Sequence, residues 1–371
     1  MGNVNKWLNE SIFINPLSPG CKMCAKGSKL VVLITGLCPA DCYYCPLSKE
    51  KKGKDRIFAD EWELSDENDT EKLILEAKYI EATGAGITGG DPLAVWSRTK
   101  KYIKLLKDEF GTNFHIHLYT SGLKNYTHIS DLIKAGLDEI RFHPMPAFGN
   151  KMEKSILKKA IRISLDAGCD VAIEIPAIPN MENEIFSLVK WANDNNLCWF
   201  NINELEFSET NANELNKKGF TVKDDISAAV KGSQETAYKI IERVSKEKLR
   251  IGIHYCSSSF KDGVQLRNRI KRRAKNTAKK SDVITNDGTF LKGVICSGRL
   301  NLDQIHEILI KEFKIDSSLI FLDKKKDRIE IAPWILQKIA QDLVKKGMNC
   351  FIVEEYPTAN RLEVEKTPLP F

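Results

Sequence analysis

A strict alternation of strand-like and helix-like segments constrains the fold of this chain more than any other feature. Short apolar runs rich in β-branched residues alternate with longer segments in which apolar residues recur every three or four positions. Such alternation predicts a parallel sheet with helical crossovers, and six to seven units predict an α/β fold with a partial or full parallel (β/α) barrel. The predicted strands are 29–35, 84–88, 114–120, 138–142, 170–175, 198–203 and 249–254, and the predicted helices are 70–82, 97–110, 129–135, 154–167, 184–194 and 226–247. In such barrels the reactive groups lie at the carboxyl ends of the strands.

The pattern changes on either side of this region. Residues 1–29 contain several helix breakers and are expected to form an irregular extension, followed by the barrel over residues 30–256. A basic connecting segment is expected over 257–285. Residues 286–371 predict a small α+β domain. Its expected elements are strand 289–295, helix 302–313, strands 319–322 and 328–331, helix 335–346, and strands 349–353 and 361–364.

Composition limits the classes of protein. The 371 residues carry a net charge of +6 from 56 basic and 50 acidic side chains, which by itself implies no nucleic-acid partner. No apolar run approaches the roughly 20 residues of a membrane helix, and the start of the chain lacks the shape of a signal peptide. We therefore expect a cytoplasmic protein with no membrane partner. In that compartment ten cysteines indicate metal or redox chemistry where they cluster and small buried side chains where they are scattered.

The densest cysteine group directly follows the first predicted strand. Cys38, Cys42 and Cys45 have C-x3-C-x2-C spacing, and three thiolates on one tight loop hold three irons of a cubane cluster. No fourth cysteine follows at ferredoxin spacing, so one iron is expected to lack a protein ligand and to remain open for catalysis. The alternative is a structural zinc loop, for which this loop alone supplies too few ligands.

This triplet, with the aromatic Tyr44 before its third cysteine, resembles the radical S-adenosylmethionine (SAM) superfamily. The resemblance implies an oxygen-sensitive [4Fe–4S] cluster whose open iron binds the amino and carboxylate groups of SAM. One electron, delivered by a reductant protein such as ferredoxin or flavodoxin, then breaks a C–S bond. The products are methionine and a 5′-deoxyadenosyl radical that abstracts hydrogen from a substrate. Tyr44 is expected to pack near the adenine.

The next strand ends support this resemblance. Gly89, Gly90 and Asp91 match the Gly-Gly-Glu-Pro-like motif that positions the SAM amino group in the superfamily, with Asp in place of the commoner Glu. The glycines allow close backbone approach. Thr120 and Ser121 end the third strand, and this strand end resembles the one that faces SAM in related enzymes.

The later strands carry polar residues toward the expected interior. Arg141 and His143 share one strand face. Glu174 lies in an apolar strand, so we expect it either to pair with Arg141 or to contact SAM. Asn201 and Asn203 are expected either near the ribose or substrate, or as satisfied core amides.

The stretch 20–273 resembles a family related to pyruvate formate-lyase activating enzyme, whose substrate is unassigned. The resemblance implies a protein substrate, as for enzymes that activate a glycyl-radical partner. RNA is the competing substrate, because residues 267–275 carry six positive charges in nine positions; the alternative for this run is a solvated helix. The rival function is a non-catalytic iron–sulfur or zinc-binding protein.

A second pair, Cys21 and Cys24, has C-x2-C spacing before the first strand. This spacing predicts half of another metal site, for zinc or an auxiliary cluster. His254 and Cys256 alternate on one strand face and are the expected partners. For the four to meet, the N-terminal extension must wrap over the barrel.

Overall fold

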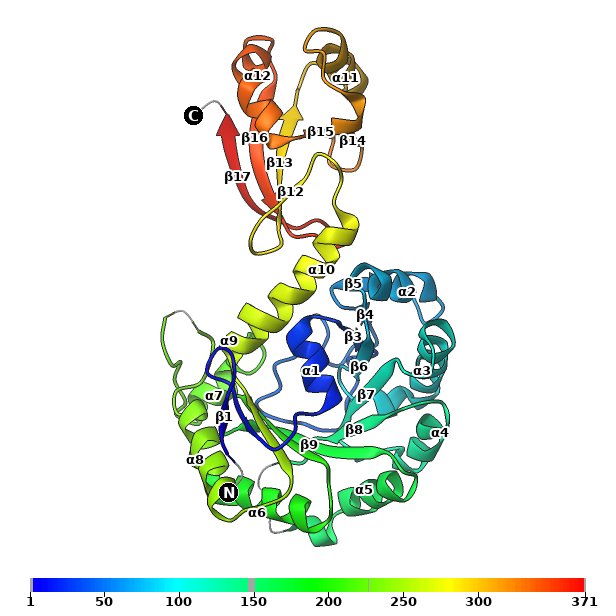
Figure 1. The fold of residues 1–371 in the computed structure, drawn as a ribbon, viewed down its shortest axis with the longest axis vertical. Coiled ribbons are helices and arrows are strands. Elements are labelled where there is room, and N and C mark those ends of the chain that lie inside the picture. The colour runs from blue at the N-terminus through cyan, green and yellow to red at the C-terminus, as the bar shows by residue number, and fades with distance from the viewer. Residues whose placement is uncertain (1–2, 146–150, 226, 370–371) are drawn as a thin grey trace. The chain divides into compact units, whose positions relative to one another are not determined.

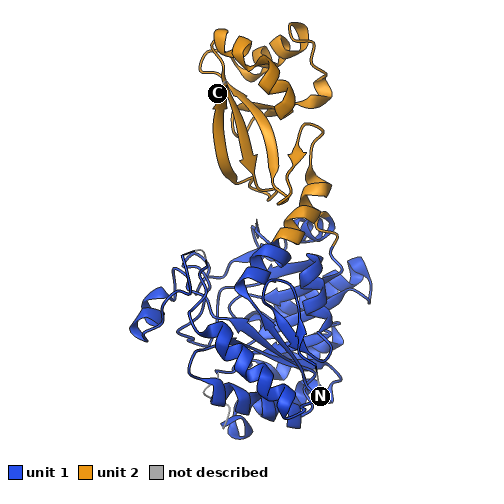
Figure 2. Cartoon of the chain, turned by 60° about the vertical axis from the view of Figure 1, so that its left-hand side comes forward, with its two compact units in different colours: residues 1–78, 82–266 blue, residues 79–81, 267–371 orange. Residues whose placement is uncertain are grey.

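The computed structural model describes residues 3–145, 151–225 and 227–369. It divides into two compact units (Figure 2). Unit 1 comprises Met1–Lys78 and Ala82–Leu266, and unit 2 comprises Tyr79–Glu81 and Arg267–Phe371.

Unit 1 is built on a curved sheet in which neighbouring strands run parallel in the order β3-β6-β7-β8-β9-β10-β11. All of their carboxyl ends therefore meet at one edge of the sheet. The strands are β3 (Lys29–Leu33), β6 (Gly84–Thr88), β7 (His115–Thr120), β8 (Glu139–Phe142), β9 (Asp170–Ala177), β10 (Trp199–Glu204) and β11 (Gly252–Cys256).

Helices connect these strands and cover the outer face of the sheet (Figure 1). In α5, for example, Leu157, Ala160, Ile161 and Ser164 are buried, and their spacing puts all four on the side that faces the strands. The connecting helices are α2 (Thr70–Tyr79), α3 (Trp96–Phe110), α4 (Ile129–Lys134), α5 (Ile156–Asp166), α6 (Glu182–Asp194), α7 (Ala212–Lys217) and α8 (Ser233–Lys246).

Antiparallel strands extend the sheet at both ends. β1 (Asn5–Lys6) and β2 (Ile12–Ile14) continue it beyond β11, and the hairpin of β4 (Ile57–Ala59) and β5 (Trp62–Leu64) continues it beyond β3. Within the described residues no strand pairing joins the two ends. The parallel part of the sheet is thus an open, curved arrangement with an inner face.

Two expectations about secondary structure were wrong, and two elements had not been predicted. Residues 1–29 are not irregular, because they form β1, β2 and the helix α1 (Pro19–Lys26). Hairpin β4–β5 and helix α7 were not expected. Helix α8 begins at Ser233 after Gly232, whose φ is 88°, and the expected start at residue 226 lies outside the described residues.

Local capping explains why α1 forms. The Ser18 side chain accepts a hydrogen bond from the backbone N–H of Cys21, Pro19 occupies the first turn, and Gly27 ends the helix with a φ of 65°. Figure 1 shows α1 within the curve of the sheet. A Cβ on Gly20 would lie 2.6 Å from Nη2 of Arg141 and 2.7 Å from Nδ1 of His117. Only glycine therefore lets the start of α1 approach the inner face this closely.

Unit 2 has an antiparallel sheet in the order β14-β15-β13-β16-β17, with β12 paired to β13. In chain order, β13, α11, β14, β15, α12 and β16 follow the βαββαβ order of ferredoxin-like folds. The elements are α10 (Arg267–Thr277), β12 (Val283–Ile284), β13 (Phe290–Cys296), α11 (Leu302–Lys311), β14 (Ile320–Asp323), β15 (Arg328–Ile331), α12 (Pro333–Lys345), β16 (Asn349–Glu355) and β17 (Glu363–Leu369).

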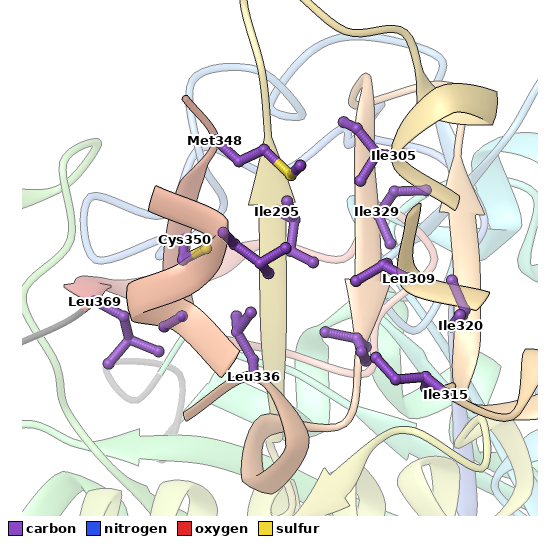
Figure 3. Close-up of a cluster of buried hydrophobic side chains, with 13 residues drawn as sticks. Ile295, Ile305, Leu309, Ile315, Ile320, Ile329, Leu336, Met348, Cys350 and Leu369 are labelled. Carbon is purple, nitrogen blue, oxygen red and sulfur yellow. The ribbon is translucent and has the colours of Figure 1, made fainter. Parts of the chain in front are cut away.

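The core of unit 2 lies between its helices and one face of its sheet (Figure 3). Ile295, Leu309, Ile329 and Leu336 are fully buried there. Cys350 joins them, and burial raises the pKa of its thiol to about 11. The prediction that scattered cysteines are small buried side chains is confirmed for this residue.

Helix α10 carries the basic run, and several of its charges have partners within unit 2. Arg267 lies 3.1 Å from Asp287, and Arg272 lies 3.3 Å from Glu81. The Arg273 guanidinium is buried over the ring of Tyr79. These cations already have partners within unit 2, which weakens the interpretation of the run as a phosphate-binding face.

Candidate functional site

The loop that carries Cys38, Cys42 and Cys45 leaves the carboxyl end of β3. Its base is closed by backbone hydrogen bonds from Gly36 N–H to the Lys54 carbonyl and from Gly53 N–H to the Gly36 carbonyl, each 2.8 Å. All three thiols are free; Cys38 is exposed and the other two are half-buried. Three accessible thiols on one closed loop are a suitable donor set for an iron–sulfur cluster.

Gly89 and Gly90 pack directly onto the segment that leads into this loop. Gly89 has a φ of 129°, and a Cβ there would lie 2.2 Å from the carbonyl oxygen of Thr35. A Cβ on Gly90 would lie 2.2 Å from the carbonyl oxygen of Leu37. The N–H of Gly90 donates to Thr35 and that of Asp91 donates to Leu37, each at 2.7 Å. The two strand ends that the sequence singled out are therefore in backbone contact.

The Asp91 side chain is fully buried and joins the end of β6 to the end of β7. Its Oδ1 accepts from the Leu93 N–H at 3.0 Å and the Thr120 hydroxyl at 2.7 Å. Its Oδ2 accepts from both the N–H and the hydroxyl of Ser121. Burial raises the pKa of this carboxyl, and the hydrogen bonds oppose that rise. Asp91, Thr120 and Ser121 thus lie together, as expected for one site, but their side chains form hydrogen bonds with one another.

A second polar network lines the inner face of the sheet. Arg141 Nη1 lies 2.7 Å from Glu174 Oε2, which confirms the predicted ion pair. Asn201 and Asn203 both donate to the same carboxylate, at 3.1 and 2.9 Å. Burial alone would raise the pKa of Glu174, but the charge of Arg141 and the hydrogen bonds of Asn203 and Arg141 hold it below its usual range. Both amides are therefore hydrogen-bonded interior groups.

Tyr44 connects the cysteine loop to this network. Its ring is buried beside Leu205 and Val230, and its hydroxyl lies 3.0 Å from Nε2 of His143. Burial lowers the pKa of His143, so the ring is neutral near pH 7. Nδ1 of His143 then donates to the Glu174 carbonyl at 2.8 Å, which leaves Nε2 to accept the Tyr44 hydrogen.

The second predicted group lies around α1 and β11. Cys21 is buried, with its Sγ 3.8 Å from Nη2 of Arg141 and 3.7 Å from Oδ1 of Asn201. Asn201 pairs in register with His254, whose ring is buried with both nitrogens unpartnered and whose pKa burial lowers to about 4. Burial raises the pKa of Cys256, and the nearby Cys21 and Cys24 thiols add to that rise. Cys21, Cys24, His254 and Cys256 therefore share one region, but among the described residues no three of them bring their ligand atoms within 4.8 Å.

The sequence missed the partners that hold these groups. The Ser18 hydroxyl accepts a hydrogen bond from Nη2 of Arg141 at 2.8 Å, and Nδ2 of Asn211 donates to the Tyr44 carbonyl at 3.0 Å. Ser-Pro-Gly at 18–20 is a helix-start signal that would have revealed α1. Asn211 carries no comparable signal.

Among the described helices, none is long and apolar enough to cross a membrane.

Comparison with known proteins identifies the family. Residues 32–192 match the radical SAM superfamily, and residues 288–369 match a domain of unknown function, DUF8061. A protein of Methanocaldococcus jannaschii with the provisional name glycyl-radical enzyme activating enzyme is 44% identical to this chain over 375 residues. The match covers 99% of this chain and 96% of that protein.

Two solved structures are similar to part of the chain. Streptococcus suis SuiB bound to S-adenosylmethionine is 11% identical with a TM-score of 0.44, covering 62% of this chain and 50% of SuiB. A radical SAM methyltransferase from Sphaerobacter thermophilus is 14% identical with a TM-score of 0.41, and the match covers 67% of this chain and 69% of the methyltransferase. The chain thus spans about half of SuiB.

From its match to the radical SAM superfamily and its 44% identical relative, the chain is a radical SAM enzyme. Within that superfamily it belongs to the family related to pyruvate formate-lyase activating enzyme.

Proposed function

We propose that this chain binds a [4Fe–4S] cluster through Cys38, Cys42 and Cys45 and cleaves SAM reductively to act on a protein substrate. The observation that carries the proposal is the backbone contact of Gly89 and Gly90 with residues 35–37, which brings the turn expected to bind SAM against the cysteine loop. When bound, the cluster supplies the electron that breaks a C–S bond of SAM. A reductant protein such as ferredoxin or flavodoxin provides that electron.

The residues of the chain have positioning roles in this proposal. Asp91 fixes Gly89 and Gly90 by holding Thr120 and Ser121, so that the turn presents backbone groups to the SAM amino group. Tyr44, oriented by His143, packs beside the adenine. Glu174 and Asn203 form the inner wall of the site and help to exclude water from it.

Anaerobic reconstitution tests the reaction. We expect wild-type protein supplied with iron and sulfide to take up about four irons per chain. After reduction with dithionite it should convert SAM to 5′-deoxyadenosine, measured by chromatography, and exposure to air should abolish the activity. Protein that takes up the irons but yields no 5′-deoxyadenosine would favour the rival function, a non-catalytic iron–sulfur protein. Uptake of zinc alone would favour the zinc-binding alternative.

A protein substrate is favoured over RNA by two observations. The relative's name refers to a glycyl-radical enzyme, which is a protein. In addition, Arg267, Arg272 and Arg273 in the basic helix already have partners within unit 2. A glycyl-radical partner would lose hydrogen from a glycine Cα, and the resulting radical would be visible by electron paramagnetic resonance.

RNA binding gives a quantitative test between these substrates. On a single strand, a protein that neutralises six phosphates loses about 300-fold in affinity between 50 and 200 mM salt. We expect this chain to show no such binding to a mixed-sequence 20-nucleotide single-stranded RNA in fluorescence anisotropy. Tight binding with that steep salt dependence, weakened by Lys271→Ala/Lys275→Ala, would overturn the preference for a protein substrate.

A further inference from the structure

Side chains of the types that bind metal ions form a separate group at the amino ends of β7 and β8, opposite the strand ends near the cysteine loop. His115 is the first residue of β7 and Glu139 the first of β8, and His117 pairs in register with Glu139. Because strand residues two apart share a face, His115 and His117 point to the same side of the sheet. One ligand atom from each of the three side chains lies within 4.8 Å of the others.

These side chains have polar atoms that nothing in the described structure satisfies. His117 and Glu139 are fully buried, with Nδ1 of His117 and Oε2 of Glu139 unpartnered. Both ring nitrogens of His115 are also unpartnered, and its Nε2 lies 3.6 Å from Oε2 of Glu139, too far for a hydrogen bond. Buried polar groups without partners are costly, and a bound ion is one of the few ways to satisfy three at once.

In Glu139 and His117, the polar atom that does not face the group contacts another side chain of the protein. Arg141 Nε donates to Oε1 of Glu139 at 2.6 Å, which leaves Oε2 free. The Lys29 amine lies against Nε2 of His117, which leaves Nδ1 free. Groups that fix the far side of a ligand in this way are typical of metal sites.

We propose that His115, His117 and Glu139 bind one divalent transition-metal ion, with zinc as the best match. Two histidines and one glutamate are an established zinc donor set, with water as the fourth ligand. Glu139 brings one negative charge to the ion, and the Arg141 guanidinium lies within ion-pair distance of both Glu139 and Glu174. The site would tie β7 to β8 and, through Arg141, to the start of α1. This placement indicates a stabilising role rather than a catalytic one.

Metal content of the full-length protein tests this proposal. Chelator-treated wild type given Zn²⁺ and desalted is expected to retain about one zinc at this site. His115→Ala and Glu139→Gln should lose that zinc, whereas His128→Ala should keep it because His128 pairs with Asp131 on the surface of unit 1. Cys21→Ala/Cys24→Ala should keep it too, which separates this site from the predicted cysteine site.

A second readout covers variants that fold poorly. Zn²⁺ should raise the thermal unfolding midpoint of wild type and of His128→Ala, but not of His115→Ala, whose side chain lies at the partly exposed edge of the group. Co²⁺ should give visible absorption bands in wild type that His115→Ala lacks. Wild type that binds neither ion, or zinc that persists in both His115→Ala and Glu139→Gln, would overturn the proposal. None of these measurements depends on SAM cleavage.

Discussion

Cys42→Ala is expected to abolish SAM cleavage while leaving the protein folded. A three-cysteine loop that loses one thiolate cannot hold the cluster in the geometry that keeps one iron open. Loss of groups that merely orient a metal ligand costs 10–100-fold, so loss of the ligand itself should lower the rate of 5′-deoxyadenosine formation by at least about 100-fold. The half-buried Cys42 side chain contributes little to the core, so the free energy of unfolding should fall by only about 1 kcal/mol.

Cys296→Ala is the matched control for this variant. Cys296 is also a half-buried free thiol, but it ends β13 in unit 2 and has no part in the proposed site. We expect wild-type iron content and wild-type SAM cleavage from it. A Cys42→Ala protein that still binds four irons and cleaves SAM would place the cluster elsewhere, and the Cys21 and Cys24 pair would be the next candidate.

The sequence predicted the parallel framework because that framework depends on local patterns. Each apolar run with β-branched residues became a strand, and each strand end could be read in chain order as part of one edge. The ion pair between Arg141 and Glu174 followed from the same logic, since polar residues on the inner faces of neighbouring strands must pair. Prediction worked wherever chain order and alternation decide the neighbours.

Prediction failed where neighbours are chosen by the three-dimensional path of the chain. Helix α1 has only eight residues, too few for a clear periodic pattern, so its caps are its only local signal. Its position against Arg141 depends on the curvature of the sheet, which no local pattern encodes. The contact between Tyr44 and His143 likewise joins residues 99 positions apart.

Asp91 illustrates the difference between identifying a residue and assigning its role. The Gly-Gly-Asp-Pro pattern predicted a turn after a strand, and the structure has a bend there, directly after β6. The resemblance suggested that the acid itself contacts SAM, but the carboxylate accepts hydrogen bonds from Leu93, Thr120 and Ser121. A shorter side chain than the usual Glu keeps its oxygens close to its own backbone, where such partners are available. The motif therefore predicts where the site lies, whereas the hydrogen bonds favour a positioning role for the carboxylate.

Gly90→Ala should disable the site without removing any ligand. The added Cβ would lie 2.2 Å from the Leu37 carbonyl oxygen, and this contact is with backbone, so no side chain can rotate away. Residues 35–37 would have to shift, and with them the start of the cysteine loop at Cys38. We expect reduced iron uptake and SAM cleavage lowered by about 100-fold, because small misplacements at a reacting centre are costly. The free energy of unfolding should fall by about 1–3 kcal/mol from the overpacking.

Gly53→Ala provides the comparison within the same loop. Gly53 has a φ of 74°, so alanine is strained there, but a Cβ would meet nothing within 4 Å. The Gly53→Ala substitution should lower the free energy of unfolding by about 1 kcal/mol and leave iron uptake and activity near wild type. Equal losses in both variants would mean that general destabilisation, rather than the contact with Leu37, limits the activity. A fully active Gly90→Ala enzyme would show that SAM cleavage does not require this close packing of the second strand end against the cysteine loop.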